Sequence, residues 1–128
     1  MISVVMPAYN NIKFIKVAIT SVLNQTFKNF ELIVVDNNST DGTVKEIQSS
    51  KFKVQNDNAK IKIIQNKENT GFSKGNNIGA KAAQGKYLVF INSDTESLDS
   101  GLEKMVKFFD NHQEVGIVGG ALKNYDES

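Results

Sequence analysis

The chain has 128 residues, of which 40% are hydrophobic and 23% are charged, and its formal net charge is +1. This composition is typical of a globular domain, and the balanced charge argues against nucleic acid as a partner, which calls for a clustered basic face. The sequence has no cysteine and one histidine, His112, which excludes disulfides, thiolate metal sites and multi-histidine metal sites. All 15 basic residues are lysines, so no arginine guanidinium is available to bind a phosphate through two hydrogen bonds.

Short apolar runs alternate along the chain with segments of helical spacing. Residues 2–6 predict a strand, and residues 15–23 repeat apolar side chains as one face of a helix, with Asn10 or Asn11 as its expected N-cap. Residues 32–35 predict the second strand. The next helical patterns carry Val44 and Ile47, then span residues 72–84 before a stop at Gly85, then carry Leu102, Met105, Val106 and Phe109. The remaining apolar runs, which predict further strands, are residues 61–64, 87–91 and 115–118.

This alternation of strand and helix predicts an α/β fold, with a mostly parallel sheet and helices on both faces. The runs Leu32–Val35 and Tyr87–Ile91 do not alternate with polar residues, so we expect both of these strands to be covered on both sides. Residues 49–60 are polar and predict a loop. No proline-rich linker or internal repeat divides the chain, so residues 1–128 are expected to form one domain.

Polar residues follow the apolar runs, at the points where the strands are expected to end. These groups are residues 7–10, residues 36–39, Asn66 and residues 92–94. The carboxyl ends of parallel strands meet at one edge of an open sheet, where ligands bind. The sequence therefore predicts a binding site built from these four groups.

Asp36 and Asp94 are expected at the ends of two different strands on that edge. Magnesium and manganese prefer oxygen ligands and often take one or two protein carboxylates together with substrate phosphates. Asp94 suits this role, while Asp36 could accept hydrogen bonds from a base or a sugar. An aspartate at a strand end also serves as a turn former or helix cap, and the residues alone leave that alternative open.

The segment of residues 69–79 carries three glycines and adjacent asparagines at a predicted helix start. Glycine inside a helix costs up to about 1 kcal/mol relative to alanine, so close packing or an approaching ligand must offset it. Close packing explains Gly79, whereas ligand approach is favoured for residues 71–77, where Lys74 is a candidate for contacting phosphate. The P-loop pattern and the GxGxxG fingerprint are both absent.

Three segments together resemble family 2 glycosyltransferases of the GT-A fold. They are ISVVMPAYNN, SVLNQTFKNFELIVVDNNSTDGT and NTGFSKGNNIGAKAAQGKYLVFINSDTE, and the likeness runs from residue 2 to about residue 120. The resemblance implies a GT-A, Rossmann-like domain that binds a nucleotide-diphosphate sugar, UDP- or dTDP-linked, together with Mg²⁺ or Mn²⁺. It implies an inverting, metal-dependent transfer to a saccharide or lipid-linked acceptor, in the synthesis of bacterial cell-surface polysaccharide.

The resemblance also carries site roles to matching positions of this chain. It implies that Asp94 binds the metal and that Asp36 and Asn37 contact the base. The other implied nucleotide-sugar contacts are Pro7, Ala8, Tyr9, Asn10, Gly71, Lys74, Gly75, Asn76, Asn77, Asn92 and Ser93.

The chain departs from the family pattern at three of these positions. Asn92 and Asn37 stand where many members have aspartate, and Asn76 stands where many have arginine. The first two differences remove negative charge near the implied metal and base. The NSD pattern of residues 92–94 is similar to that of members that transfer rhamnose or related sugars.

Family members carry a second half that binds the acceptor and supplies the general base, and no residue after position 100 matches that role. We therefore expect this chain to supply the donor and metal site, and to transfer poorly by itself, with the base beyond residue 128. A non-catalytic nucleotide-binding module of the same fold is the alternative, which Asn37 and Asn92 favour. A response-regulator domain and a nucleotidyltransferase are disfavoured, because the first strand is followed neither by an acidic pair nor by a glycine-rich basic loop.

Location and assembly follow from the same features as expectations. No apolar run approaches the roughly 18 residues needed to span a bilayer, and the N-terminus lacks the basic region of a signal peptide. We expect a cytoplasmic protein that can lie at the inner face of the membrane. Without an acceptor half, its exposed apolar surface would favour self-association.

Overall fold

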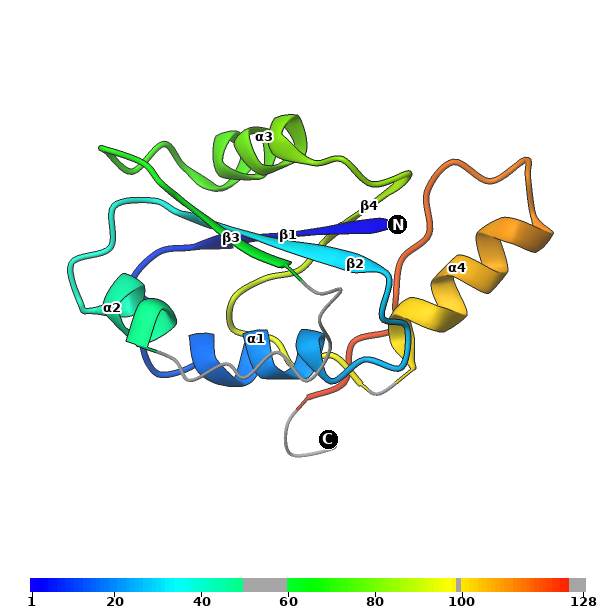
Figure 1. Cartoon of the computed structure of the whole chain (residues 1–128), viewed down its shortest axis with the longest axis horizontal. Helices are drawn as coiled ribbons and strands as arrows, with labels where there is room; N and C mark the ends of the chain where they lie inside the picture. Colours follow the sequence, from blue (N-terminus) through cyan, green and yellow to red (C-terminus); the bar gives the residue numbers. More distant parts are fainter. Residues whose placement is uncertain (50–59, 99, 125–128) are drawn as a thin grey trace.

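The computed structural model describes residues 1–49, 60–98 and 100–124 of the chain. These residues form a four-stranded, entirely parallel sheet in the order β3-β2-β1-β4 (Figure 1). The strands are β1 (Ile2–Ala8), β2 (Phe30–Asp36), β3 (Lys60–Gln65) and β4 (Tyr87–Phe90). The helices are α1 (Ile15–Leu23), α2 (Thr43–Ser49), α3 (Phe72–Ala82) and α4 (Gly101–Asn111). The predicted α/β class is confirmed.

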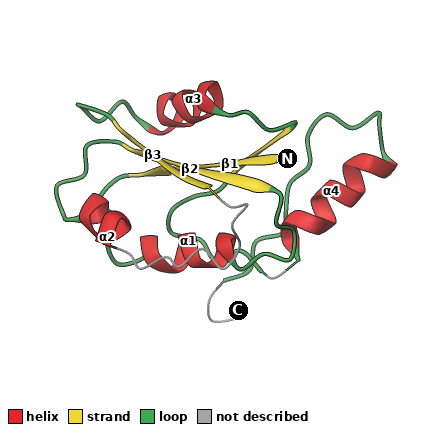
Figure 2. Ribbon diagram, in the orientation of Figure 1, coloured by secondary structure: helices red, strands yellow, loops and turns green. Residues whose placement is uncertain are grey.

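Helices lie on both faces of the sheet (Figure 2). The α1 side holds the larger apolar core, to which the even-numbered positions of β1 and β2 contribute, together with one face of α1 and Leu102 of α4. On the other face, α3 packs its small residues against a smaller cluster made of Val5, Ile33 and Val35. Because alternate residues of a strand point to opposite faces, β1 and β2 feed both cores at once.

The register of the strands brings their carboxyl ends together. Ala8 of β1 pairs with Asp36 of β2, which in turn pairs with Gln65 of β3. The chain leaves β4 one position after Phe90, where the Ile91 amide donates to the Val5 carbonyl at 3.0 Å. The polar segments that follow the strands therefore emerge at one edge of the sheet, as the sequence predicts.

Two predictions at the β4 side of the molecule are wrong. The first is that β4 is covered on both sides: Leu88 is 46% and Phe90 is 52% exposed, because α3 contacts β1 and β2 and β4 is an edge strand. The second is a strand at residues 115–118, which have no regular structure, and Ile117 is 91% exposed. An apolar run forms a buried strand only where other strands or helices pack against it. The periodicity of the sequence does not show whether such elements are present.

Some predicted helix signals are also corrected. Asn10 and Asn11 do not cap α1, whose N-cap is Phe14, with no side-chain capping bond. Helix α3 ends at Ala82, before the predicted residue 84, because Ala83 is already extended. Gly85 is therefore not its stop. A Cβ at Gly85 would lie 2.6 Å from the Ser3 amide nitrogen, so close approach to β1 explains this glycine.

Most of the predicted loop at residues 49–60 lies outside the described residues, while Ser49 ends α2 and Lys60 begins β3. Among the residues that the structure describes, no helix has the length and apolar character to cross a membrane.

Candidate functional site

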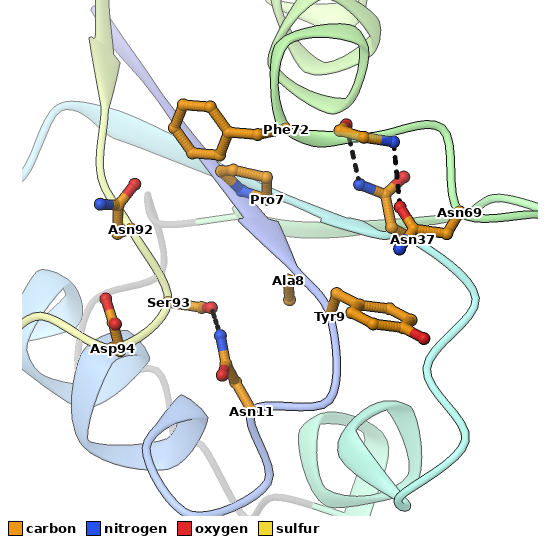
Figure 3. A pocket seen from close by; sticks show the side chains of 11 residues that line it. Pro7, Ala8, Tyr9, Asn11, Asn37, Asn69, Phe72, Asn92, Ser93 and Asp94 are labelled. Carbon is orange, nitrogen blue, oxygen red and sulfur yellow. Dashed lines mark hydrogen bonds between the residues drawn. The ribbon is translucent and has the colours of Figure 1, made fainter.

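A cavity of about 370 Å³ opens at the carboxyl edge of the sheet (Figure 3). Four segments surround it: the end of β1 with the residues that follow it, Asn37 directly after β2, the region between Asn69 and the first turn of α3, and the segment after β4. Pockets that bind small ligands have volumes of roughly 300–1,000 Å³, so this cavity falls at the lower end of that range. Its lining residues are Pro7, Ala8, Tyr9, Asn11, Asn37, Asn69, Gly71, Phe72, Asn92, Ser93 and Asp94.

The loops that follow β1 and β2 are fastened to each other. The Asn10 amide donates to Ser39 Oγ at 3.0 Å, and the Thr40 amide donates to Asn10 Oδ1 at 2.8 Å. Asn10 adopts a left-handed backbone with φ of 50°, a conformation that asparagine tolerates better than most residues. Asn10 therefore fixes the loop beside the cavity and does not line it.

Asp41 makes a second link between these loops. Its carboxylate accepts from the Thr43 amide at 3.0 Å and from the Ile12 amide at 3.1 Å. Partial burial acts to raise the pKa of Asp41, but the hydrogen bonds from Thr43 and Ile12 outweigh it and hold this pKa below its ordinary value. The ionised carboxylate is therefore the form that the two loops bind.

Asp36 has the structural role that the sequence left open. Its side chain is buried, with the residue 2% exposed, and it accepts hydrogen bonds from the Ser39 amide at 3.1 Å and from the Ser39 hydroxyl. This arrangement closes a turn at the end of β2. Asp36 is not among the residues that line the cavity.

Asn37, the next residue, lines the cavity and is also bound on several sides. Its Nδ2 donates to the Gly71 carbonyl at 3.1 Å, while its Oδ1 accepts from Asn66 Nδ2 and Thr70 Oγ1, both at 2.8 Å. Asn66, which the sequence placed at this edge, therefore acts through Asn37 and does not line the cavity.

The segment after β4 supplies polar groups to the wall of the cavity that lies across from Asn37 (Figure 3). Ser93 is buried, and its hydroxyl accepts a hydrogen bond from the Asn11 side-chain amide (Figure 3). Asn92 and Asp94 flank Ser93 and are exposed. Among the described residues that line the cavity, Asp94 is the one charged side chain.

The fit of these residues to a metal ion can be judged from their chemistry. The described residues contain no group of three or more histidine, cysteine, aspartate or glutamate side chains that could enclose a metal. One exposed carboxylate beside an open cavity fits Mg²⁺ or Mn²⁺ when substrate phosphates and water complete the coordination, since these ions often take few protein ligands. Asp94 is thus compatible with such a metal, in a site that the protein alone does not complete.

The start of α3 forms the upper rim of the cavity in Figure 3. Gly71 has φ of 85°, a backbone that favours glycine, and it provides no side-chain cap for the helix. Phe72 lines the cavity and is 61% exposed. The first amide groups of a helix lack intrahelical partners and carry partial positive charge, so this rim can favour an anion.

Four predicted site residues lie further along α3, away from the cavity lining. They are Lys74, Gly75, Asn76 and Asn77. Gly75 is explained by packing, because a Cβ there would lie 2.9 Å from Asn37 Nδ2. Asn76 Oδ1 is buried without a hydrogen-bond partner among the described residues.

The cavity brings together eight of the predicted residues and adds Asn11, Asn69 and Phe72. Sequence reasoning treated Asn11 as a helix cap, whereas Phe72 falls within residues 71–77, for which ligand approach was favoured without Phe72 being named as a site residue. Their adjacency to PAYN and to Gly71 is a signal that could have identified them. Asn69 Oδ1 accepts from the Gly71 amide at 2.9 Å, a local turn that the Asn-Thr-Gly pattern is typical of.

Comparison with known proteins assigns the family. The family model described as Glycosyl transferase family 2 matches residues 3–128. An uncharacterized glycosyltransferase of Haemophilus influenzae is 33% identical over 123 residues, which are 96% of this chain and 37% of that protein. TuaG of Bacillus subtilis, a glycosyltransferase named for teichuronic acid biosynthesis, is 34% identical over 108 residues, 84% of this chain and 41% of TuaG. The chain therefore spans less than half the length of these relatives.

Solved structures agree with this result. S. aureus TarS 1-349 in complex with UDP-GlcNAc has a TM-score of 0.77 and 30% identity, covering 88% of this chain and 32% of that chain. The mannosyltransferase PcManGT from Pyrobaculum calidifontis has a TM-score of 0.76 at 22% identity, over 84% of this chain and 32% of that chain, which supports the fold alone. With the family model matching nearly all of its residues, the chain belongs to glycosyltransferase family 2.

Proposed function

We propose that the cavity binds the nucleotide diphosphate of a sugar donor, and that this chain is the donor-binding part of an inverting, metal-dependent glycosyltransferase. The observation that carries the proposal is the position of Asp94, an exposed carboxylate on the wall of a cavity at the carboxyl edge of the sheet. The UDP-GlcNAc complex of TarS, a structural neighbour at 30% identity, supports a nucleotide sugar as the ligand.

The chemistry of the lining residues suits them to different parts of the donor. Tyr9 is 46% exposed and offers an aromatic face to a base, while the asparagine amides offer both donors and acceptors. The amides at the start of α3 favour the diphosphate. Asp94 would hold Mg²⁺ or Mn²⁺, which when bound neutralises charge on the diphosphate. Lys74 lies off the lining, so we assign it no contact with the phosphates.

The proposed reaction is a displacement at the anomeric carbon of the donor sugar. The acceptor hydroxyl forms a new bond to this carbon, the bond from the carbon to the diphosphate oxygen breaks, and the hydroxyl proton passes to a general base. No residue of this chain is assigned as that base. We therefore propose that a further part of the protein supplies the base and the site for a saccharide or lipid-linked acceptor. Transfer to a saccharide acceptor by this 128-residue chain alone would refute that division.

The test is calorimetric titration with UDP and with dTDP, with and without Mn²⁺. The proteins are the wild type, Asp94→Ala and a control, Asp110→Ala, which removes an exposed carboxylate from α4, outside the lining. We expect Mn²⁺ to tighten nucleotide binding in the wild type and in the control. Asp94→Ala should lose this gain, by about tenfold or more in Kd, because hydrogen bonds and ion contacts to charged groups are worth about 1.5–3 kcal/mol.

Two other outcomes would overturn parts of the proposal. Nucleotide binding that depends neither on Mn²⁺ nor on Asp94 would identify a non-catalytic nucleotide-binding module of the same fold. Absence of binding for both nucleotides would reject this cavity as a donor site in the chain as it stands. The tighter of the two nucleotides would assign the donor class, with dTDP favouring a rhamnose-type donor.

A further inference from the structure

The segment after β4, which carries Asp94, is bound to the rest of the protein at points outside the cavity. It passes along α1 before the chain reaches α4 (Figure 1). The Ser97 amide donates to Ser21 Oγ of α1 at 2.9 Å, and Gln25 Nε2, just after α1, donates to the Leu98 carbonyl at 2.7 Å. Neither Ser21 nor Gln25 lines the cavity. These two side chains therefore contact the segment and not a ligand.

Gln25 also connects the segment to the start of α4. The residue is 1% exposed, and its Oε1 accepts from the Leu102 amide at 3.1 Å. A carbonyl only accepts and a backbone amide only donates, so Leu98 and Leu102 together determine the orientation of the Gln25 amide. Ser100, the N-cap of α4, makes no side-chain capping bond. Gln25 therefore satisfies one of the amides at the start of α4 that lack an intrahelical partner.

Asp94 lies in a short turn before the bond at Ser97. The Thr95 amide and the Thr95 hydroxyl both donate to the Asn92 carbonyl, at 3.3 Å and 2.8 Å. The side chains of Asn92 and Asp94 are exposed, so packing in a core does not hold them. Hydrogen bonds on either side of the turn therefore set where the Asp94 carboxylate lies.

Ser21 supplies the hydrogen bond that follows this turn. Its hydroxyl donates to the Ala18 carbonyl at 2.8 Å and presents a lone pair to the Ser97 amide. On the other side of the turn, the Asn11 side chain donates to the Ser93 hydroxyl. Asn11 lines the cavity, where a ligand can also contact it, whereas Ser21 contacts protein groups alone among the described residues.

We propose that Ser21 and Gln25 are positioning residues, which hold the segment after β4 against α1 and thereby set the position of the Asp94 carboxylate on the cavity wall. The proposal rests on the proposed donor-binding function. Both residues act through the segment, so their loss should reduce the contribution of a divalent cation to nucleotide binding. It should leave the contacts of the nucleotide with the remaining lining residues in place.

The decisive variant is Ser21→Ala, which removes the acceptor of the Ser97 amide. The matched control is Thr20→Val, which removes a hydroxyl from the neighbouring position of α1. Thr20 is half-buried like Ser21, and its hydroxyl has no hydrogen bond within the described residues. Hydrogen–deuterium exchange of the Thr95 amide, and of β1 and β2, reports on the turn and on the sheet. Calorimetric titration with UDP, with and without Mn²⁺, measures the gain in affinity that the metal provides.

We expect Ser21→Ala to speed exchange at Thr95 and to reduce the gain from Mn²⁺, each by about three- to tenfold, because an amide left without its acceptor shifts a local equilibrium by about that factor. UDP affinity without Mn²⁺ and exchange in β1 and β2 should match the wild type, since a merely structural role would change them as well. Thr20→Val should match the wild type throughout. Unchanged Thr95 exchange, an unchanged gain from Mn²⁺, or equal weakening of UDP binding with and without Mn²⁺ would each overturn the proposal.

A second variant, Gln25→Glu, tests the other contact. It keeps an acceptor for the Leu102 amide and removes the donor to the Leu98 carbonyl. It should reduce the gain from Mn²⁺ in the same direction, and a gain equal to the wild type would contradict the role of Gln25. Ser21→Ala decides the proposal if Gln25→Glu does not fold. If the wild type itself shows no gain from Mn²⁺, the proposed function fails, and Thr95 exchange in Ser21→Ala alone supports or rejects the hold of α1 on the segment.

Discussion

Glu31 is a buried carboxylate outside the cavity, near the amino end of β2. It is 3% exposed, and its Oε1 accepts from the Ser3 hydroxyl at 2.6 Å and from the Gln84 amide at 2.7 Å. Lys62 of the neighbouring strand β3 reaches its other oxygen at 2.9 Å. The Glu31 side chain therefore links strands β1, β2 and β3 with the segment that follows α3.

The pKa of Glu31 gives this network a pH dependence. Burial acts to raise the pKa, but hydrogen bonds from Ser3, Gln84 and Lys62 and the charge of Lys62 outweigh it, so the pKa lies below the ordinary glutamate value. A group whose pKa is lowered by folding stabilises the protein above its unfolded pKa, which is about 4.3 for glutamate. This stabilisation is lost as the pH falls below that value and through the lowered pKa.

We expect Glu31→Gln to lower the free energy of unfolding at pH 7 by about 1–3 kcal/mol, because the variant loses the ion pair and leaves Lys62 without its partner. The difference from the wild type should shrink as the pH falls from 5 to 3, since protonation removes the same stabilisation from the wild type. Urea unfolding across this pH range measures both effects. Glu68→Gln, at an exposed position, is the control and should follow the wild-type curve. A pH-independent difference would contradict the role of the carboxylate charge.

At the scale of elements, the close packing of α3 against the sheet depends on Gly79. A Cβ at this position would lie 2.3 Å from Val5 Cγ1 and 3.2 Å from Val35 Cγ2, both of which belong to the buried cluster under the helix. Alanine would therefore push the helix away from β1 and β2. Because the same helix carries the rim of the cavity at its other end, its distance from the sheet also affects the site.

Gly79→Ala is expected to destabilise the fold by about 1–3 kcal/mol, the usual cost of overpacking a core. The gain in helix propensity, at most about 1 kcal/mol, does not offset a contact this short. Thermal unfolding measures the effect. Gly116→Ala is the matched control, because nothing lies within 4 Å of its added Cβ, and it should stay within about 0.5 kcal/mol of the wild type. Equal melting temperatures for the two variants would show that α3 can shift without cost.

Sequence reasoning predicted best those elements that are buried along their whole length. β1 and β2 are central strands buried along their whole length, so their continuous apolar runs correspond directly to their environment. The order of strand and helix predicted the parallel sheet, and hence the edge where the cavity lies. β4 and residues 115–118 have similar runs, but within the described residues β4 has a neighbouring strand on one side only and residues 115–118 form no strand, a difference that the sequence pattern does not contain.

The cavity was predictable in outline for a similar reason. Pro7, Tyr9, Ser93 and Asp94 follow strand ends, and parallel topology is enough to bring strand ends together. The turn at Asp36 was one of the alternatives that the sequence left open, whereas the contacts of Asn37 were not predictable, because they depend on which polar group lies opposite its side chain. Ser39 is close to Asp36 in sequence, but Thr70 and Gly71 reach Asn37 only through the fold.

At the scale of the whole molecule, the α3 face of the sheet is only partly covered. Within the described residues, α3 contacts β1 and β2, whereas β4 has a paired neighbour on one side only. Leu88 and Phe90 project from this edge strand, 46% and 52% exposed. An open strand edge beside exposed apolar side chains favours pairing with another chain.

We expect a second copy of the chain to occupy this edge, so that the protein self-associates as its concentration rises. Replacing both exposed residues, Leu88→Ser with Phe90→Ser, should lower the weight-average mass measured by light scattering, because it removes the apolar surface that association would bury. Ile117→Ser is the control: it removes a side chain that is 91% exposed but lies outside any strand, and it should leave the mass unchanged. A wild type that stays monomeric at high concentration would contradict the prediction, and an equal effect of Ile117→Ser would move the contact away from β4.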